Sequence, residues 1–136
     1  MTSVELVDDI RQIMVKKVVT ISPEADLATA ARLMAKNHVG SIVVVRRGKL
    51  IGIITESDFM RFASTGCDMG KSRVGDYMRK KIVTCGPSCR ILDALMLMKR
   101  FKVRHLPIAT KDRKLLGIVS LRDLIAASQL TSIYLI

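Results

Sequence analysis

The sequence predicts an α/β fold made of two similar βαββα units related by a pseudo-twofold axis. The first observation behind this prediction is an internal repeat. Residues 14–20 read MVKKVVT and precede Pro23, and residues 78–84 read MRKKIVT and precede Pro87. A repeat of this length corresponds to a whole supersecondary unit and not to one turn of a solenoid. Two similar units in one chain predict two similar half-sites.

The second observation is a matching strand-to-helix junction in each copy. Residues 50–55 read LIGIIT and precede Asp58, and residues 115–120 read LLGIVS and precede Asp123. The repeat interval is 64 residues at the prolines and 65 at the aspartates, so the second copy has gained one residue in its middle. A unit of roughly 60 residues alone buries only about 60% of its unfolded surface, so we expect the halves to share a core.

The elements of the first copy follow from its hydrophobic periodicity. We expect a strand at 18–21, a helix at 26–37, strands at 41–46 and 49–54 joined around Arg47 and Gly48, and a helix that begins at Glu56. The first helix carries its apolar residues on one face: Leu27, Ala30, Ala31 and Met34.

The second copy repeats these elements, but its first helix is apolar nearly all round over residues 91–98. The helix over 121–127 is similar, as is the pair Phe59 and Met60 in the first copy. A helix without a polar face is buried on more than one side. We therefore predict a homodimer through helical faces; packing between the two repeats is the alternative. Residues 10–14 and 74–78 are expected to begin the first and the second domain, which span residues 1–66 (with an N-terminal helix) and 67–136.

Composition describes a compact globular chain, with 49% hydrophobic and 26% charged residues among 136. The longest apolar runs are strand-sized, well short of the roughly 18 residues that a membrane helix needs. Acidic residues near the N-terminus, among them Glu5 and Asp8, interrupt any signal-peptide core. The sequence thus predicts a cytoplasmic protein without a membrane partner.

Three cysteines, Cys67, Cys85 and Cys89, are too few for a disulfide framework and are odd in number. Zinc prefers four soft ligands, and only His38 and His105 could supplement the cysteines, at unsuitable spacings. We interpret the cysteines as reduced small hydrophobic residues and expect no metal.

The net charge of +11 is unevenly distributed. Residues 1–66 hold nine Lys and Arg against seven Asp and Glu, whereas residues 67–136 hold fourteen against five. Cations at a helix C-terminus explain only part of this excess. An anionic ligand, an acidic partner or nucleic acid would explain the remainder.

Two tetrapeptides carry the chemistry, residues 55–58 (TESD) and 120–123 (SLRD). A hydroxyl followed three residues later by an acid is a capping box, a common way to begin a helix. The functional alternative is an anion site, in which free amides hold phosphate and the carboxylate binds ribose hydroxyls. Gly52 and Gly117 favour the anion site, because a glycine within a strand often marks a place where a ligand or another backbone segment approaches closely.

With these motifs in both copies, about residues 10–128 resemble a tandem pair of cystathionine beta-synthase (CBS) domains, the Bateman module. The resemblance implies an α/β module of two CBS motifs packed through their sheets, with clefts between them that bind AMP, ADP, ATP or S-adenosylmethionine. It also implies dimerisation of modules. No catalytic domain is expected beside the pair, so the resemblance indicates a stand-alone regulatory protein that is not an enzyme and requires no cofactor.

The resemblance assigns ligand contacts by position. Asp58 and Asp123 would bind ribose hydroxyls, and Thr55 and Ser120 would face phosphate or the ribose edge. The remaining predicted contacts line the adenine pocket or the cleft wall: Val19, Thr20, Val39, Gly40 and Ser41 in the first copy, and Val83, Thr84, Val103, Arg104, His105, Leu106 and Pro107 in the second.

The copies differ in charge at these positions. Arg104 and Arg122 in the second copy correspond to Gly40 and Ser57 in the first. A phosphate that faces two arginines gains charge-assisted hydrogen bonds, so the second half-site is predicted to be the tighter anion site. His105 lacks an evident catalytic partner, and no catalytic residue is predicted.

The leading interpretation is a module that binds an adenine nucleotide and reports to an unidentified regulated protein. The alternative is a nucleic-acid-binding or protein-interaction scaffold that uses the basic second half. Nucleic acid ranks second because no aromatic residues alternate with the basic ones and no RNA-binding signature is present.

Overall fold

The computed structural model describes residues 8–127, which form two compact units. The first unit contains residues 17–82 and 112–115, and so holds most of the first repeat. The second unit contains residues 8–16, 83–111 and 116–127. The α/β class and the two tandem motifs are confirmed.

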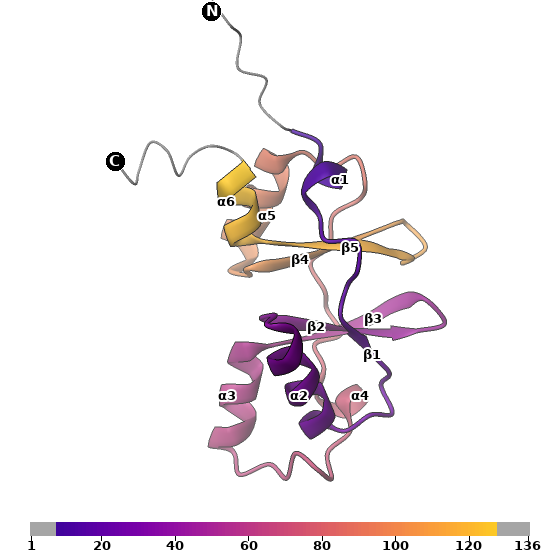
Figure 1. Cartoon of the computed structure of the whole chain (residues 1–136), viewed down its shortest axis with the longest axis vertical. Helices are drawn as coiled ribbons and strands as arrows, with labels where there is room; N and C mark the ends of the chain where they lie inside the picture. The colour runs from indigo at the N-terminus through magenta and orange to yellow at the C-terminus, as the bar shows by residue number, and fades with distance from the viewer. Residues whose placement is uncertain (1–7, 128–136) are drawn as a thin grey trace, which may run out of the picture. The chain divides into compact units, whose positions relative to one another are not determined.

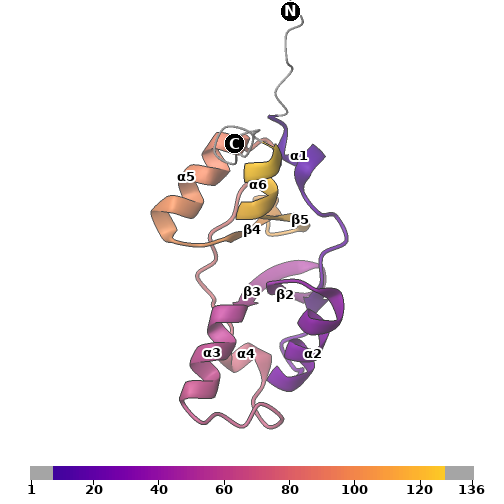
Figure 2. The same cartoon turned by 60° about the vertical axis from the view of Figure 1, so that its left-hand side comes forward.

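The first unit is a three-stranded sheet of order β1-β2-β3 with helices on one face (Figures 1 and 2). Strand β1 runs parallel to β2, and β2 runs antiparallel to β3. The elements are β1 (Thr20–Ile21), α2 (Leu27–Asn37), β2 (Ser41–Arg46), β3 (Lys49–Thr55), α3 (Glu56–Ser64) and α4 (Val74–Tyr77).

Local chemistry explains the boundaries of these elements. The Asp26 side chain accepts the Thr29 N–H at 2.7 Å and so caps the start of α2. His38 ends that helix in the left-handed conformation, as a C-cap residue. Arg47 and Gly48 both have positive φ, which fits the tight two-residue connection between β2 and β3. The predicted helices and the hairpin of this copy are therefore confirmed within a residue or two.

The second unit is a two-stranded sheet, β4-β5, with α5 and α6 on one face (Figures 1 and 2). Its elements are α1 (Ile10–Ile13), α5 (Ile91–Phe101), β4 (His105–Ala109), β5 (Leu115–Ser120) and α6 (Leu121–Ala127). The connection from β4 to β5 is longer than its counterpart, and this is where the extra residue of the second repeat lies.

A short first strand was expected in the second copy as well, and this expectation is wrong. The chain makes only an isolated parallel bridge, between Cys85 and Ile108. Its two hydrogen bonds join Cys85 N to Pro107 O at 3.1 Å and Ala109 N to Cys85 O at 3.0 Å. Gly86 and Pro87 follow at once, and proline cannot donate a further ladder hydrogen bond.

The two short helices are exchanged between the repeats. Helix α1 precedes the first repeat but packs in the second unit, where Val15 and Ile118 exchange backbone hydrogen bonds of 2.8 and 3.0 Å. Helix α4 precedes the second repeat but packs in the first unit, where Arg79 and Ile53 make the same exchange at 3.0 and 3.2 Å. Residues 10–14 and 74–78 therefore pack outside the compact unit that holds the rest of their own repeat. The domain boundary at residue 66 stays a prediction.

Most of the buried hydrophobic residues fall into two clusters, one in each unit. A core shared by the two halves stays a prediction. Ile10 from α1 completes the second unit's cluster, and Val74 from α4 completes the first unit's cluster. The exchanged helices thus supply apolar surface that each repeat alone lacks.

Cys85 and Cys89 form a disulfide with a Cα–Cα distance of 5.9 Å, which corrects the expectation of reduced thiols at these positions. The turn through Gly86 and Pro87 brings the two cysteines within bonding reach, a proximity that counting cysteines does not reveal. Cys67 is a free thiol, as expected.

Candidate functional site

In the first unit, the pairing of β2 with β3 gathers most of the predicted contacts. Ser41 pairs with Thr55 in the sheet, and the Glu56 N–H donates to the Gly40 carbonyl at 3.1 Å. Val39, Gly40 and Ser41 therefore lie beside the start of α3. Thr20 and its neighbour Val19 are on the opposite side of β2, where Thr20 is paired with Val43.

The tetrapeptide at the start of α3 forms the capping arrangement that the sequence predicts. The Thr55 N–H donates to Asp58 Oδ2 at 2.9 Å, and the Thr55 hydroxyl donates to the same oxygen at 3.2 Å. The Thr55 and Ser57 hydroxyls lie 3.0 Å apart. Asp58 thus has a structural role at this helix start.

Asp58 is also the centre of an ion-pair cluster that the sequence analysis missed. Arg79 Nη2 lies 2.8 Å from Asp58 Oδ1, and Arg61 Nη2 lies 3.2 Å from the same oxygen. The Asp58 side chain is only 1% exposed. Burial opposes ionisation of this carboxyl, but the hydrogen bonds from Arg79 and Thr55 outweigh it and hold its pKa below the usual value.

One signal in the sequence could have revealed Arg79. It follows Met78, and the corresponding residue after Met14 is Val15. A difference at one position of an otherwise close repeat marks a place where the half-sites diverge. The exchange of α1 and α4, which brings Arg79 to Asp58, is not visible in the repeat pattern.

In the second unit, the equivalent contacts assemble around α6. The Leu121 N–H donates to the Arg104 carbonyl at 2.8 Å, which matches the bond between Glu56 and Gly40. Ser120 and Asp123 form a reciprocal capping box: the Ser120 N–H donates to Asp123 Oδ2 at 3.2 Å, and the Asp123 N–H donates to Ser120 Oγ at 3.1 Å.

The remaining predicted contacts of the second unit follow from the Cys85 bridge and from β4. The bridge places Thr84 and Val83 beside Pro107, and Val103 and His105 flank Arg104 at the entry to β4. The side chains of Arg104 and Arg122 are exposed, His105 is half-buried, and Leu106 and Pro107 are buried. These placements bring together polar, basic and apolar groups at one end of the β4-β5 sheet.

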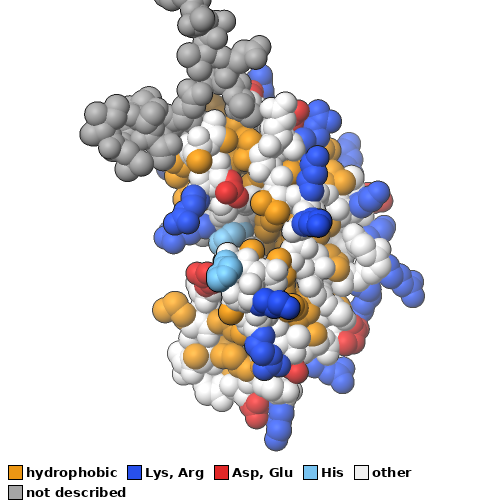
Figure 3. Space-filling view, in the orientation of Figure 1, with side chains coloured by type: hydrophobic (Ala, Val, Ile, Leu, Met, Phe, Trp, Pro, Cys, Tyr) orange, Lys and Arg blue, Asp and Glu red, His pale blue; other side chains and the backbone are white. Residues whose placement is uncertain are grey.

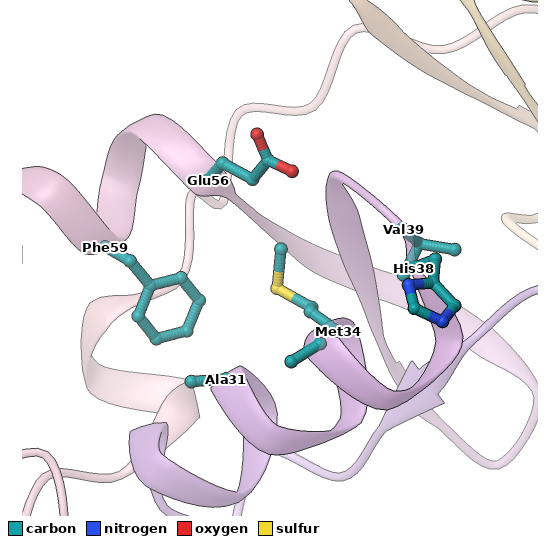
Figure 4. A pocket seen from close by; sticks show the side chains of 7 residues that line it. Ala31, Met34, His38, Val39, Glu56 and Phe59 are labelled. Atoms are coloured by element: carbon teal, nitrogen blue, oxygen red, sulfur yellow. The ribbon is translucent and has the colours of Figure 1, made fainter.

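A groove of about 530 Å³ lies elsewhere in the first unit, between α2 and the start of α3 (Figure 4). Its wall is largely apolar, with Met34 and Phe59 facing the space and Glu56 at its edge (Figure 4). Val39 is its single residue in common with the predicted contacts. The groove therefore adjoins the predicted ligand contacts at Val39 but shares no other residue with them.

Residues 8–127 contain no group of three or more His, Cys, Asp or Glu side chains that could hold a metal ion. None of the helices within this range is long and apolar enough to cross a membrane.

Comparison with known proteins places the two sequence repeats in a family. The family model for the CBS domain matches residues 9–65 and again residues 74–130. The CBS domain-containing protein YhcV of Bacillus subtilis is 36% identical over 124 residues, which cover 90% of this chain and 86% of that protein.

Two solved structures share the fold. The CBS domain pair of protein MJ0100, solved with 5'-methylthioadenosine and S-adenosyl-L-methionine, has a TM-score of 0.81 at 21% identity and covers 94% of this chain and 98% of that chain. The CBS domain protein PAE2072 from Pyrobaculum aerophilum, solved with AMP, has a TM-score of 0.79 at 22% identity and covers 86% and 89% of the two chains.

Proposed function

The chain belongs to the CBS domain family and carries two CBS motifs in tandem, and from this premise we propose that it is a non-enzymatic regulatory module that binds an adenosine-containing ligand. AMP is the ligand proposed first, and ADP, ATP and S-adenosylmethionine are the alternatives. The AMP, 5'-methylthioadenosine and S-adenosyl-L-methionine in the two structural neighbours support this ligand class.

The observation that carries the proposal is that the Asp123 carboxylate is partly exposed and has few hydrogen-bond donors around it. Its side chain is partly exposed, and among residues 8–127 its carboxylate accepts only the Ser120 N–H. A carboxylate has about four lone-pair positions, so Asp123 retains acceptor capacity for two ribose hydroxyls. The carboxylate lies at the end of β5, next to the backbone of Arg104 through the bond between Leu121 and Arg104.

Charge favours a phosphate at the same half-site. Arg122 precedes Asp123, Arg104 lies at the start of β4, and both side chains are exposed. Hydrogen bonds from arginine to phosphate are charge-assisted and contribute about 1.5–3 kcal/mol each. We assign the phosphate of AMP to these two side chains, and the adenine ring to the apolar surface near Val83 and Val103.

The experiment that tests the proposal is calorimetric titration of nucleotide-free protein with AMP, and then with ATP and S-adenosylmethionine, at fixed physiological salt. Asp123→Ala is expected to lose most of the affinity, because it removes the ribose acceptor. Asp76→Ala is the control, since Asp76 is likewise an aspartate in the first turn of a helix, but it is exposed and lies in the first unit. Equal affinity of Asp123→Ala and the wild type would contradict the site assignment.

A homodimer remains part of the proposal. Leu92 and Met96 on α5 are 65% and 62% exposed, and Met60 on α3 is 76% exposed. Leu92 and Met96 lie one turn apart on α5, and neighbouring exposed apolar side chains of this kind mark interaction surfaces. Sedimentation analysis of the wild type and of Leu92→Lys would test the dimer, since a charge in such an interface is expected to release monomers.

The second candidate, a nucleic-acid-binding scaffold, rests on the basic excess of the second repeat. Lys and Arg side chains are visible on both compact units in Figure 3. Retention of RNA or DNA at physiological ionic strength, with a steep salt dependence, would favour it over the nucleotide module. The regulated protein and the cytoplasmic location stay predictions.

A further inference from the structure

We propose that Arg79 binds the Asp58 carboxylate and so prevents it from binding ribose in the first half-site. The chain then binds its adenosine ligand through Asp123 and not through Asp58. This inference rests on the proposed function and names the residue that makes the two half-sites unequal. It concerns two groups of the same compact unit, and its evidence is the arrangement of donors around Asp58.

Donors from the protein already fill the lone-pair positions of the Asp58 carboxylate. Oδ1 faces Arg79 Nε and Arg79 Nη2, both at 2.8 Å, and Arg61 Nη2 at 3.2 Å. Oδ2 faces the Thr55 N–H at 2.9 Å and the Thr55 hydroxyl at 3.2 Å. Four of these contacts are hydrogen bonds, and they fill the roughly four positions that a carboxylate offers. With the side chain 1% exposed, a ribose hydroxyl can reach Asp58 only by displacing Arg79.

The second unit has the same backbone arrangement without the arginine. Arg79 forms a backbone bridge with Ile53, and Val15 forms the equivalent bridge with Ile118. Met78 precedes Arg79, and a Cβ added at Gly52 would meet its side chain. Met14 precedes Val15, and a Cβ added at Gly117 would meet its side chain in the same way. The residue after that methionine therefore occupies the same place in both units.

Asp58 pairs with two arginines, whereas the residues at the equivalent positions of the second unit cannot pair with Asp123. Val15 stands in place of Arg79, and Ala126 stands in place of Arg61. Within the described range 8–127, no salt bridge involves the Asp123 carboxylate. Asp58 and Asp123 lie at the same position of the motif but differ in their partners. Asp58 is paired with guanidinium groups, whereas Asp123 can accept a hydrogen bond from a ligand hydroxyl.

The repeat itself supplies the test, because each residue can be exchanged for its counterpart. Arg79→Val gives the first unit the residue of the second, and Val15→Arg gives the second unit the residue of the first. Val15 is 47% exposed, so an arginine fits there without repacking the core. Arg79→Lys keeps the charge but loses the planar fork, and it serves as the control for charge alone.

The measurement is calorimetric titration with AMP and separately with adenosine, which needs no phosphate ligand. We expect the wild type to bind one ligand per chain. Arg79→Val is expected to bind a second equivalent of at least one of the two probes, and Val15→Arg is expected to lower the affinity of the single site at least tenfold. Circular dichroism of each variant confirms that the fold is retained.

The outcomes separate this inference from the proposed function. Two equivalents bound by the wild type would overturn the inference and leave the proposed function intact. No binding of either probe by the wild type would overturn both. One equivalent in the wild type with unchanged affinity in Val15→Arg would overturn the inference alone, even if Arg79→Val failed to fold.

Discussion

Arg79 reaches across the first unit to Asp58, with both Nε and Nη2 at 2.8 Å from Oδ1 of that carboxylate. The pair joins the segment after α4 to the first turn of α3, although 21 residues separate the two in sequence. The ion pair therefore has two effects: it stabilises the segment after α4, and it fills the acceptor positions of Asp58 in the first half-site.

Arg79→Ala is expected to lower the free energy of unfolding of the first unit by about 1–3 kcal/mol, because it leaves a buried carboxylate with fewer donors. Guanidinium denaturation followed by circular dichroism measures the change. Lys80→Ala is the matched control: Lys80 is the exposed neighbour, and its loss is expected to cost less than about 0.5 kcal/mol. Equal midpoints for the two variants would contradict the role of the ion pair.

The ion pair also predicts a dependence of stability on pH. The pKa of Asp58 is lower in the folded state than in the unfolded chain, so the native state favours the ionised form. This contribution is fully present above the unfolded value of about 3.9 and is lost as the pH falls through the folded pKa. The free energy of unfolding should therefore decline below about pH 4.

The control for this dependence is Asp58→Asn, which cannot ionise. Other lowered carboxyl pKa values, such as that of Asp26, act equally in both proteins. Asp58→Asn should therefore show a shallower acid decline than the wild type when unfolding is measured from pH 6 downwards. Parallel curves would mean that Asp58 is not stabilised in its ionised form.

Gly117→Ala is expected to destabilise the second unit by about 1–3 kcal/mol through overpacking. A Cβ at this position would lie 2.7 Å from Met14 Sδ and 3.0 Å from the Val15 carbonyl oxygen, so the exchanged segment would have to move. Gly86→Ala in the same unit is the control, since its Cβ would meet nothing within 4 Å. Thermal unfolding of the two variants distinguishes them, and a cost shared by both would argue against the close packing of Met14 on β5.

The cysteines give a prediction of covalent state. Because Cys85 and Cys89 are bonded to each other, only Cys67 is expected to react with a maleimide under non-reducing conditions. Three thiols are expected after reduction in denaturant, and mass spectrometry counts the adducts. Three adducts on the unreduced, unfolded chain would restore the sequence-based expectation of free thiols.

Periodicity was sufficient for the elements that are defined by local sequence. The apolar face of α2 and the alternating residues around Arg47 and Gly48 predict a helix and a hairpin that the structure contains. It was insufficient for the placement of α1 and α4, because four-residue helices carry no signal of which repeat they pack against. Long-range packing decides that placement.

The candidate site shows the same division. The two motifs that end in Asp58 and Asp123 both begin with a hydroxyl residue and end with an aspartate, and both form the predicted capping arrangement. Their difference depends on Arg79, which is 21 residues from Asp58 and reaches it only because of the segment exchange. The motif alone therefore could not show that Asp58 is paired with arginine and that Asp123 is not.

Ligand binding through Asp123 is tested most directly by calorimetric titration of the nucleotide-free wild type with AMP, beside Asp123→Ala at the same salt concentration. We expect micromolar binding at one site per chain in the wild type and loss of most of that affinity in the variant. Absence of heat in the wild type, or the same isotherm for both proteins, would contradict it.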